Sequence, residues 1–508
     1  MISLDKMRRL AKALKTAAVS GDTDALARVR AVLPDVIDIK HADALHVIAR
    51  EQGYESWPKA KFMVEALQMD RAEKAERLKM ALYFGQHWMV DALLEETPGL
   101  SRENLGLACA LYDLGFVREA LAKDPKAATR IVGVRRPITH LAFSQHINGG
   151  GSADAMIAVA EALVVGGADV NDFHNYNNDP NAPLSCLYGA LGHARNIVLA
   201  EWLLDRGADP NDGESLYHST EMGSTDGLKL LLKHGARVSG TNAIPRALDF
   251  NDHEAVRLLL AAGGDPNEGI TPAPSGEPSY VIPALHQAAR RMCDAEMFKI
   301  LLDAGADPSR RYKGVTPYAM AKVYGNWVAA DLIAQAGGDT SLTREESLMA
   351  MAVDGPIPDG EYLDPDKLPD EFRNMLRLIL HLPGKMAHLK RWVALGLEYD
   401  RPDEMGVTPV QIAGWEGLPE VMEYFLRLKP DLSHVNEYGG TLLGTIIHGS
   451  ENNEARESRD HLGCARLALQ EGVALPVDAI KFAGQPEMAA FLADWAQAHP
   501  GQVVQESP

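Results

Sequence analysis

The sequence predicts an all-α solenoid of stacked helix–turn–helix units, and the main evidence is a turn that recurs along the chain. It occurs, as Gly-Ala-Asp or a close variant, at residues 167–169, 207–209, 235–237, 263–265, 305–307 and 337–339. The third residues of successive turns lie 40, 28, 28, 42 and 32 positions apart. A unit that repeats at such intervals indicates a stack in which each unit packs against its neighbours.

A helix is predicted before each of these turns. Ala255, Leu258, Leu259 and Ala262 fall on one helical face directly before the turn at 263–265. Apolar residues at this spacing indicate an amphipathic helix. Glycine follows because the chain often leaves a helix in a left-handed conformation, which costs other residues free energy. Each turn therefore ends the second helix of a unit.

The first helix of a unit is predicted at residues 283–289, 314–321 and 406–413, where a proline is followed by alanines. Proline suits the first turn of a helix, and alanines let neighbouring helices approach closely. These segments resemble the first helices of ankyrin repeats, whose period of about 33 residues lies near the spacing of the turns. Each unit should be two antiparallel helices and a turn.

Five segments are predicted in order along the chain. They are an N-terminal helical capping module (1–70), an ankyrin-repeat block (71–340), an irregular acidic segment (341–374), a second ankyrin-repeat block (375–500) and a loose tail (501–508). The capping module resembles one that often precedes ankyrin repeats in bacterial proteins. The acidic segment is predicted because residues 341–373 hold nine acidic and three basic residues and four prolines.

Size and charge narrow the class of protein. A chain of 508 residues exceeds the usual limit of about 250–300 residues for one core, which agrees with a long stack. The net charge of −20, from 50 basic and 70 acidic residues, opposes phosphate binding. We expect no nucleic-acid partner.

The cysteines and the N-terminus bear on location. Four cysteines lie far apart with no C-x-x-C pair, which argues against a zinc ribbon and against a disulfide framework. Charged residues interrupt the first 20 positions, so they do not form a signal peptide, and no apolar stretch of about 20 residues occurs elsewhere. We expect a cytoplasmic protein without a membrane partner.

Taken together, the repeats resemble those of bacterial ankyrin-repeat proteins. This resemblance implies protein–protein binding on a concave face formed by turn tips and first helices. It implies no set of catalytic residues.

Two long inserts between a turn and the next helix are candidate binding loops. Residues 170–183 carry Phe173, His174 and Tyr176, and residues 269–283 carry Tyr280. Loops at this point of successive units project from one side of a stack, so they would extend one binding surface. The alternative is that both are solvated loops without a partner.

A polar cluster is predicted around His218, at a position where the first helix of a repeat normally carries an apolar residue. A buried polar group needs a hydrogen-bond partner, and the candidates are Tyr217, Glu221, Asn242 and Asp249. The cluster is either an internal network that fixes the register of the repeats or a site that contacts a ligand. His286, on another first helix, is a further candidate binding residue.

No catalytic or metal-binding motif is present. No two of the 17 histidines are three or four residues apart, and neither a P-loop nor a G-x-S-x-G elbow occurs. We therefore expect no cofactor and no metal. The predicted function is a non-enzymatic scaffold for a protein partner with a basic surface. The alternative is an enzyme or small-molecule binder at the His218 cluster.

Overall fold

The computed structural model describes residues 2–37, 39–176, 179–269, 282–357, 359–453 and 455–505, most of which are helical. The α-helices are α1 (Leu4–Val19), α2 (Thr23–Val32), α3 (His41–Glu51), α4 (Trp57–Ala66), α5 (Arg71–Tyr83), α6 (His87–Glu96), α7 (Leu105–Ala110), α8 (Leu114–Lys123), α9 (Pro137–Ala142), α10 (Ala153–Val165), α11 (Cys186–Tyr188), α12 (Ile197–Leu204), α13 (Ser215–Ser219), α14 (Asp226–Lys233), α15 (Ala243–Asp249), α16 (His253–Ala261), α17 (Ala284–Arg290), α18 (Ala295–Asp303), α19 (Pro317–Tyr324), α20 (Trp327–Gln335), α21 (Arg344–Asp354), α22 (Asp370–Arg373), α23 (Met375–Ile379), α24 (Met386–Ala394), α25 (Pro409–Trp415), α26 (Pro419–Arg427), α27 (Leu442–Asn452), α28 (His461–Gln470), α29 (Val477–Phe482) and α30 (Pro486–Ala498).

Short helical turns and two small sheets are the other regular elements of the described residues. The turns are η1 (Leu100–Arg102), η2 (Ala127–Thr129), η3 (Gln145–Gly149), the π-helical η5 (Gly189–His193), η6 (Pro365–Lys367), η7 (Arg456–Ser458) and η8 (Pro500–Gln502). Strand β1 (Phe173–Asn175) pairs antiparallel with β2 (Pro183–Ser185). Strand β3 (Leu475–Pro476) pairs parallel with β4 (Val503–Val504).

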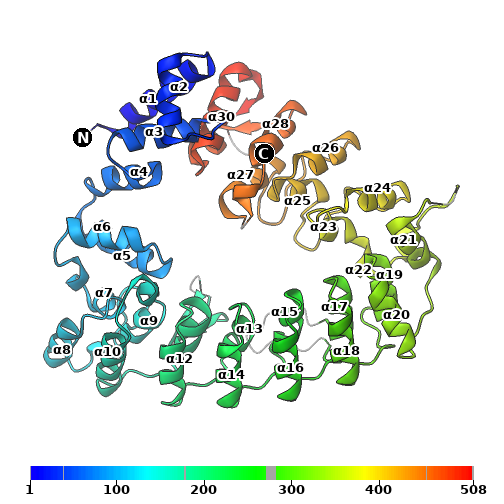
Figure 1. Cartoon of the computed structure of the whole chain (residues 1–508), viewed down its shortest axis with the longest axis horizontal. Helices are drawn as coiled ribbons and strands as arrows, with labels where there is room; N and C mark the ends of the chain where they lie inside the picture. The colour runs from blue at the N-terminus through cyan, green and yellow to red at the C-terminus, as the bar shows by residue number, and fades with distance from the viewer. Residues whose placement is uncertain are drawn as a thin grey trace.

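The helices pair into units that stack side by side, as the sequence predicts. Figure 1 shows α13, α15 and α17 along the inside of a curved stack and α14, α16 and α18 along its outside. Helices of the same layer contact one another from unit to unit, as α15 does with α17 and α16 with α18. The molecule therefore has an inner and an outer helical layer.

The recurring turns end the outer helices through glycine. Gly207 has a φ of +89°, a left-handed conformation that favours glycine. Ala208 N then donates to Leu203 O, which satisfies a carbonyl at the end of α12.

An asparagine just after several of these turns joins each one to the next. Asn171 Nδ2 donates to Gly207 O at 3.1 Å, and Asn171 Oδ1 accepts from Asp209 N at 2.7 Å. Asn267 makes the same two bonds, to Gly305 O and from Asp307 N. These bonds fix the register between neighbouring units.

Most of the stack shares one hydrophobic core, which runs from Leu105 to Leu492. A separate core packs α1–α4 between Met7 and Ala60, and a third lies between Phe62 and Ala110. The N-terminal capping module and the exact domain boundaries remain predictions.

The stack curves until its two ends meet, with the N-terminal helices beside α30 (Figure 1). Ala42 N donates to Glu487 Oε1 at 3.1 Å, and Lys12 Nζ lies 3.9 Å from an oxygen of Asp494.

The segment 341–374 is less irregular than predicted, because it contains α21. Thr343 and Glu346 form a capping box that starts this helix, in which the Thr343 side chain accepts from Glu346 N and the Glu346 side chain accepts from Thr343 N. The four prolines of the segment all follow the helix and leave its hydrogen bonds intact.

The tail predicted to be loose, 501–508, is held in place at its start. Gln502 Nε2 donates to Leu469 O at 2.8 Å and to Val473 O at 2.6 Å, and β4 pairs with β3. A single amide that satisfies two carbonyls at the end of α28 explains the difference. Residues 506–508 lie outside the described residues.

None of the helices in the described part of the chain combines the length and apolar character that a membrane span requires. All four cysteines are unpaired and buried.

Candidate functional site

A connected line of polar and aromatic side chains runs along the inner layer of the stack. It starts at the end of α5 and reaches the end of α17, and we call it the inner-face line. Its members, in chain order, are Tyr83, Arg135, Phe143, His174, Tyr188, His193, Glu214, Tyr217, His218, Glu221, Arg246, Asp249, Gln287 and Arg291.

The C-terminal half of this line is a network of ion pairs centred on Arg246. His218 at the end of α13 contacts Glu221 through Nδ1 at 2.9 Å and Glu214 through Nε2 at 3.3 Å. Arg246 Nε donates to Glu221 at 2.7 Å and its Nη1 donates to Asp249 at 2.9 Å. The network therefore ties α13 to α15.

Asp249 extends this network to the next unit. Its carboxylate accepts from Arg291 Nε at 2.8 Å and from Gln287 Nε2 at 2.5 Å. Three donors thus converge on one largely buried side chain: one from α15, one from α17 and one from the residue that follows α17.

The charges in this network support one another. Burial opposes the charged form of His218, but hydrogen bonds with Glu214 and Glu221 outweigh it and raise the pKa of His218 above its ordinary value. Burial likewise opposes ionisation of Glu221, but bonds with His218 and Arg246 hold its pKa below the ordinary value. The network is a closed set of opposite charges.

The N-terminal half of the line is centred on Arg135, in the turn before α9. The guanidinium carbon of Arg135 lies 4.6 Å from the ring centroid of Tyr83 and 5.1 Å from that of Phe143. Its Nη2 lies 3.2 Å from His174 Nε2. Among the described residues no acidic side chain pairs with Arg135.

The histidines around Arg135 stay neutral. Burial, reinforced by the positive charge of Arg135, lowers the pKa of His174 to about 4. Burial also lowers the pKa of His140 to about 4, where a bond to Val132 O opposes the shift and Arg135 adds to it. Burial lowers the pKa of His193 as well.

The first insert is a β-hairpin that carries His174 to this cluster. The ring of His174 packs edge-on against Phe143, with centroids 4.5 Å apart. Phe173 and Tyr176 of the same insert remain about half exposed. Asp172, at the start of the hairpin, pairs with Arg136 at 2.6 Å, so the arginine next to Arg135 does have an acidic partner.

The structure brings five predicted residues into the line: His174, Tyr217, His218, Glu221 and Asp249. Asn242 lies apart from them at the N-terminus of α15, in a left-handed conformation. His286 is fully buried and its Nε2 lies 3.0 Å from Val315 O, so it joins two units and is closed to a partner. Tyr280 lies outside the described residues.

Four residues that were not predicted from the sequence connect the predicted ones: Arg135, Phe143, Tyr188 and Arg246. A signal for Arg246 was present, since Glu221 and Arg246 are oppositely charged residues that follow or end successive first helices. For Arg135, the signal was the pair of arginines directly before Pro137.

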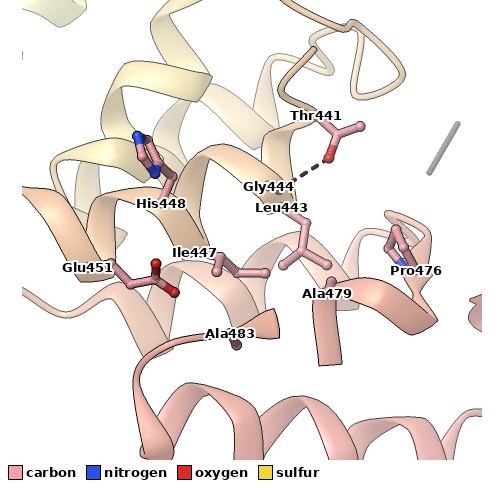
Figure 2. Close-up of a pocket in the computed structure, with 9 residues that line it drawn as sticks. All are labelled: Thr441, Leu443, Gly444, Ile447, His448, Glu451, Pro476, Ala479 and Ala483. Atoms are coloured by element: carbon pink, nitrogen blue, oxygen red, sulfur yellow. Dashed lines mark hydrogen bonds between the residues drawn. The ribbon is translucent and has the colours of Figure 1, made fainter. Parts of the chain in front are cut away.

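A groove of about 220 Å³ lies further along the inner layer, between α27 and α29. Figure 2 shows Leu443 and Ile447 of α27 pointing toward the α29 segment, with His448 and Glu451 at one side. Glu451 Oε1 accepts from Gly484 N at 2.5 Å, so one side of the groove is already closed by the protein's own chain. Within the described residues, no group of three or more His, Cys, Asp or Glu side chains is placed to hold a metal ion.

A comparison with known protein families agrees with this architecture over one unit. A family model of the ankyrin repeat matches residues 283–313, which include α17 and α18. Among solved structures, the chain is similar to the ankyrin repeat domain of human ASB11, with 16% sequence identity, 49% of this chain and 96% of that chain covered, and a TM-score of 0.25. No curated protein matches the chain significantly. The matched repeat and the stacked helix pairs show an all-α ankyrin-repeat solenoid, and ankyrin repeats are in general protein-interaction modules.

Proposed function

We propose that this chain is a non-enzymatic, cytoplasmic scaffold that binds a protein partner along its concave face. The observation that carries the proposal is the inner-face line, in which partly exposed aromatic and charged side chains from successive units form one surface. Tyrosine and arginine are frequent anchors at protein interfaces. The four buried, unpaired thiols fit a reducing compartment.

The charge of the chain favours a partner with a basic surface. A net charge of −20 attracts positive proteins over distances comparable with the Debye length. Such attraction speeds encounter more than it deepens affinity. The association rate should therefore fall steeply as salt is added.

The closed network at His218 favours this function over the alternative of chemistry at the same place. Both ring nitrogens of His218 have carboxylate partners, and Glu221 is held by Arg246 as well. A catalytic histidine needs one nitrogen available to a substrate.

A photo-crosslinking amino acid at one of two matched positions tests the proposal. Phe250, at the end of inner helix α15, is 52% exposed, and Val198, on outer helix α12, is 51% exposed. We expect variants at position 250 to capture a distinct protein in the cytoplasm of the native host, and variants at position 198 to capture none.

Salt and partner charge refine this test. The crosslink yield at position 250 should fall as salt is raised, and the captured protein should be basic. Capture from position 198 alone, or from neither position at low salt, would contradict binding at the concave face.

A further inference from the structure

The surroundings of Arg135 differ from those of other partly buried arginines on the inner face. Arg246 has Glu221 and Asp249, and Arg377 has Asp403. Arg135 contacts the ring nitrogen of His174, the side chain of Tyr83 and the faces of two aromatic rings, but no carboxylate among the described residues. A charged group that has left water normally has an ionic partner, and Arg135 has none among the described residues.

Two buried donors at this point also lack acceptors. Arginine can only donate hydrogen bonds, so His174 Nε2 must accept from Arg135 and the neutral ring carries its proton on Nδ1. That Nδ1 and Arg135 Nε are both buried without a hydrogen-bond partner among the described residues. Unsatisfied donors beside a cation call for an anionic acceptor.

The cavity beside Arg135 has room for one small group of a ligand but not for a whole ligand. A small cavity of about 10 Å³ is lined by Arg135 together with Tyr83, His140 and Phe143. This volume holds about one water-sized group, which corresponds to a single oxygen of a larger group. Phe84 packs edge-on against Tyr83 and is 57% exposed, so an apolar surface borders the site.

We propose that Arg135 is an anchor for a carboxylate of the protein partner, whose oxygen enters the cavity while the adjoining chain covers Phe84. The proposal rests on the proposed function and adds a recognition element to it. A carboxylate fits better than a phosphate, since its planar oxygens match one guanidinium and the neighbouring Lys79 is already paired with Glu76. The carboxylate comes from an aspartate or glutamate side chain or from a chain terminus.

The full-length protein with ¹⁵N-labelled histidine allows a direct test with acetate as the probe. Acetate replaces chloride at constant ionic strength and pH 7 while the histidine signals are followed by NMR. We expect the His174 signal, assigned with His174→Gln, to shift saturably with a dissociation constant on the order of 1–50 mM. Bound acetate should also raise the pKa of His174 from about 4, because a negative charge favours the protonated ring.

Two arginine variants show whether acetate binding depends on Arg135 in particular. Arg135→Gln should weaken acetate binding at least about tenfold, which corresponds to losing a hydrogen bond to a charged group. Arg206→Gln is the matched control, because Arg206 also lies over an aromatic ring, that of Trp202 at 4.0 Å, but pairs with Glu161. It removes the same charge and should leave acetate binding unchanged. Where Arg135→Gln fails to fold by circular dichroism, Arg135→Lys keeps the charge and should still weaken binding.

The outcomes distinguish a failure of the proposed Arg135 anchor from a failure of the proposed scaffold function. A His174 signal that does not move with acetate, or that moves equally in Arg135→Gln, would overturn the anchor. The cavity would then hold a water molecule. Crosslinking at position 250 could still succeed, because it does not depend on Arg135. Acetyl-aspartate amide and acetyl-alanine then distinguish the source, since the first presents a side-chain carboxylate and the second a chain end. Tighter binding of either supports the site, and a failure of both to displace acetate would overturn it.

Discussion

Arg246 and Arg135 lie on the same inner face, each against two aromatic rings, yet their electrostatic surroundings are opposite. The guanidinium carbon of Arg246 is 4.9 Å from the Phe250 centroid, close to the 4.6 Å that separates Arg135 from Tyr83. Arg246 has two carboxylates and Arg135 has none among the described residues. Aromatic stacking alone therefore does not determine what an arginine does here; the nearby acids do.

The pKa values of His218 and His174 show the same difference between the two regions. His218 lies between two carboxylates, which outweigh burial and raise its pKa, whereas burial and the charge of Arg135 lower the pKa of His174. The Arg246 region is a closed network of ion pairs that connects neighbouring repeats. The Arg135 region holds a positive charge that is available to an incoming anion.

Acidification should show this difference most strongly, by destabilising the Arg135 region more than the Arg246 network. His140 and His174 have folded-state pKa values of about 4, below their ordinary 6.5, so the unfolded chain binds more protons between these pH values. Their contribution to stability is lost as the pH falls from 6.5, approaching roughly 3 kcal/mol by pH 4 for His140, which is almost fully buried, and less for His174, which is screened more by solvent. Hydrogen exchange at pH 6.5 and 4.5, corrected for intrinsic rates, should show protection falling in α9 and the β1–β2 hairpin.

A variant without two of these histidines is the control for this prediction. The double variant His140→Gln/His174→Gln lacks two of the three histidines around Arg135, so protection of α9 should then change less with pH than in the wild type. Acetate should also protect the wild-type region, provided that it binds at Arg135. Equal loss of protection in α9 and α15 would show that the two regions do not differ.

Removal of Asp249 should have the next largest effect, because three donors lose one acceptor. Asp249→Ala leaves Arg246, Arg291 and Gln287 without this carboxylate, and hydrogen bonds to charged groups each contribute about 1.5–3 kcal/mol. We expect the free energy of unfolding of this part of the stack to fall by about 2–3 kcal/mol, measured by urea denaturation and hydrogen exchange.

Asp331→Ala is the matched substitution on the exposed side of outer helix α20. Its effect should stay within about 0.5 kcal/mol. Similar losses for the two variants would mean that the Asp249 network contributes no more than an ordinary surface residue.

Much of the fold could be predicted from the sequence because its determinants are local. The glycine at each turn, the proline at several helix starts and the apolar stripe between them act within one unit, so α16 and α19 follow from short segments. The exceptions have local causes too. The capping box of Thr343 and Glu346 starts a helix inside a segment whose acidic and proline-rich composition suggested none.

The candidate site could be predicted only in part, since it depends on contacts between units. Tyr217, His218 and Glu221 lie within one short segment and were found together. Arg135 and His174 are 39 residues apart, and an insert of unknown shape separates the helices that would position them. The hairpin pairing that turns His174 toward Phe143 leaves no periodic signal in a polar loop.

The smallest predicted effect concerns His218 and has the opposite pH dependence from the Arg135 region. The folded-state pKa of His218 is raised, so its stabilisation is fully present below its ordinary value of 6.5 and is lost as the pH rises through the raised value. Between pH 6 and pH 8 the wild-type protein should lose about 1 kcal/mol or less of unfolding free energy from this group. In His218→Gln, which can still donate to one carboxylate, this part of the pH dependence should vanish, as urea denaturation at the two pH values would show. A variant with an unchanged slope would place the histidine outside the charge network, and the contrast with His174 would then rest on Arg135 alone.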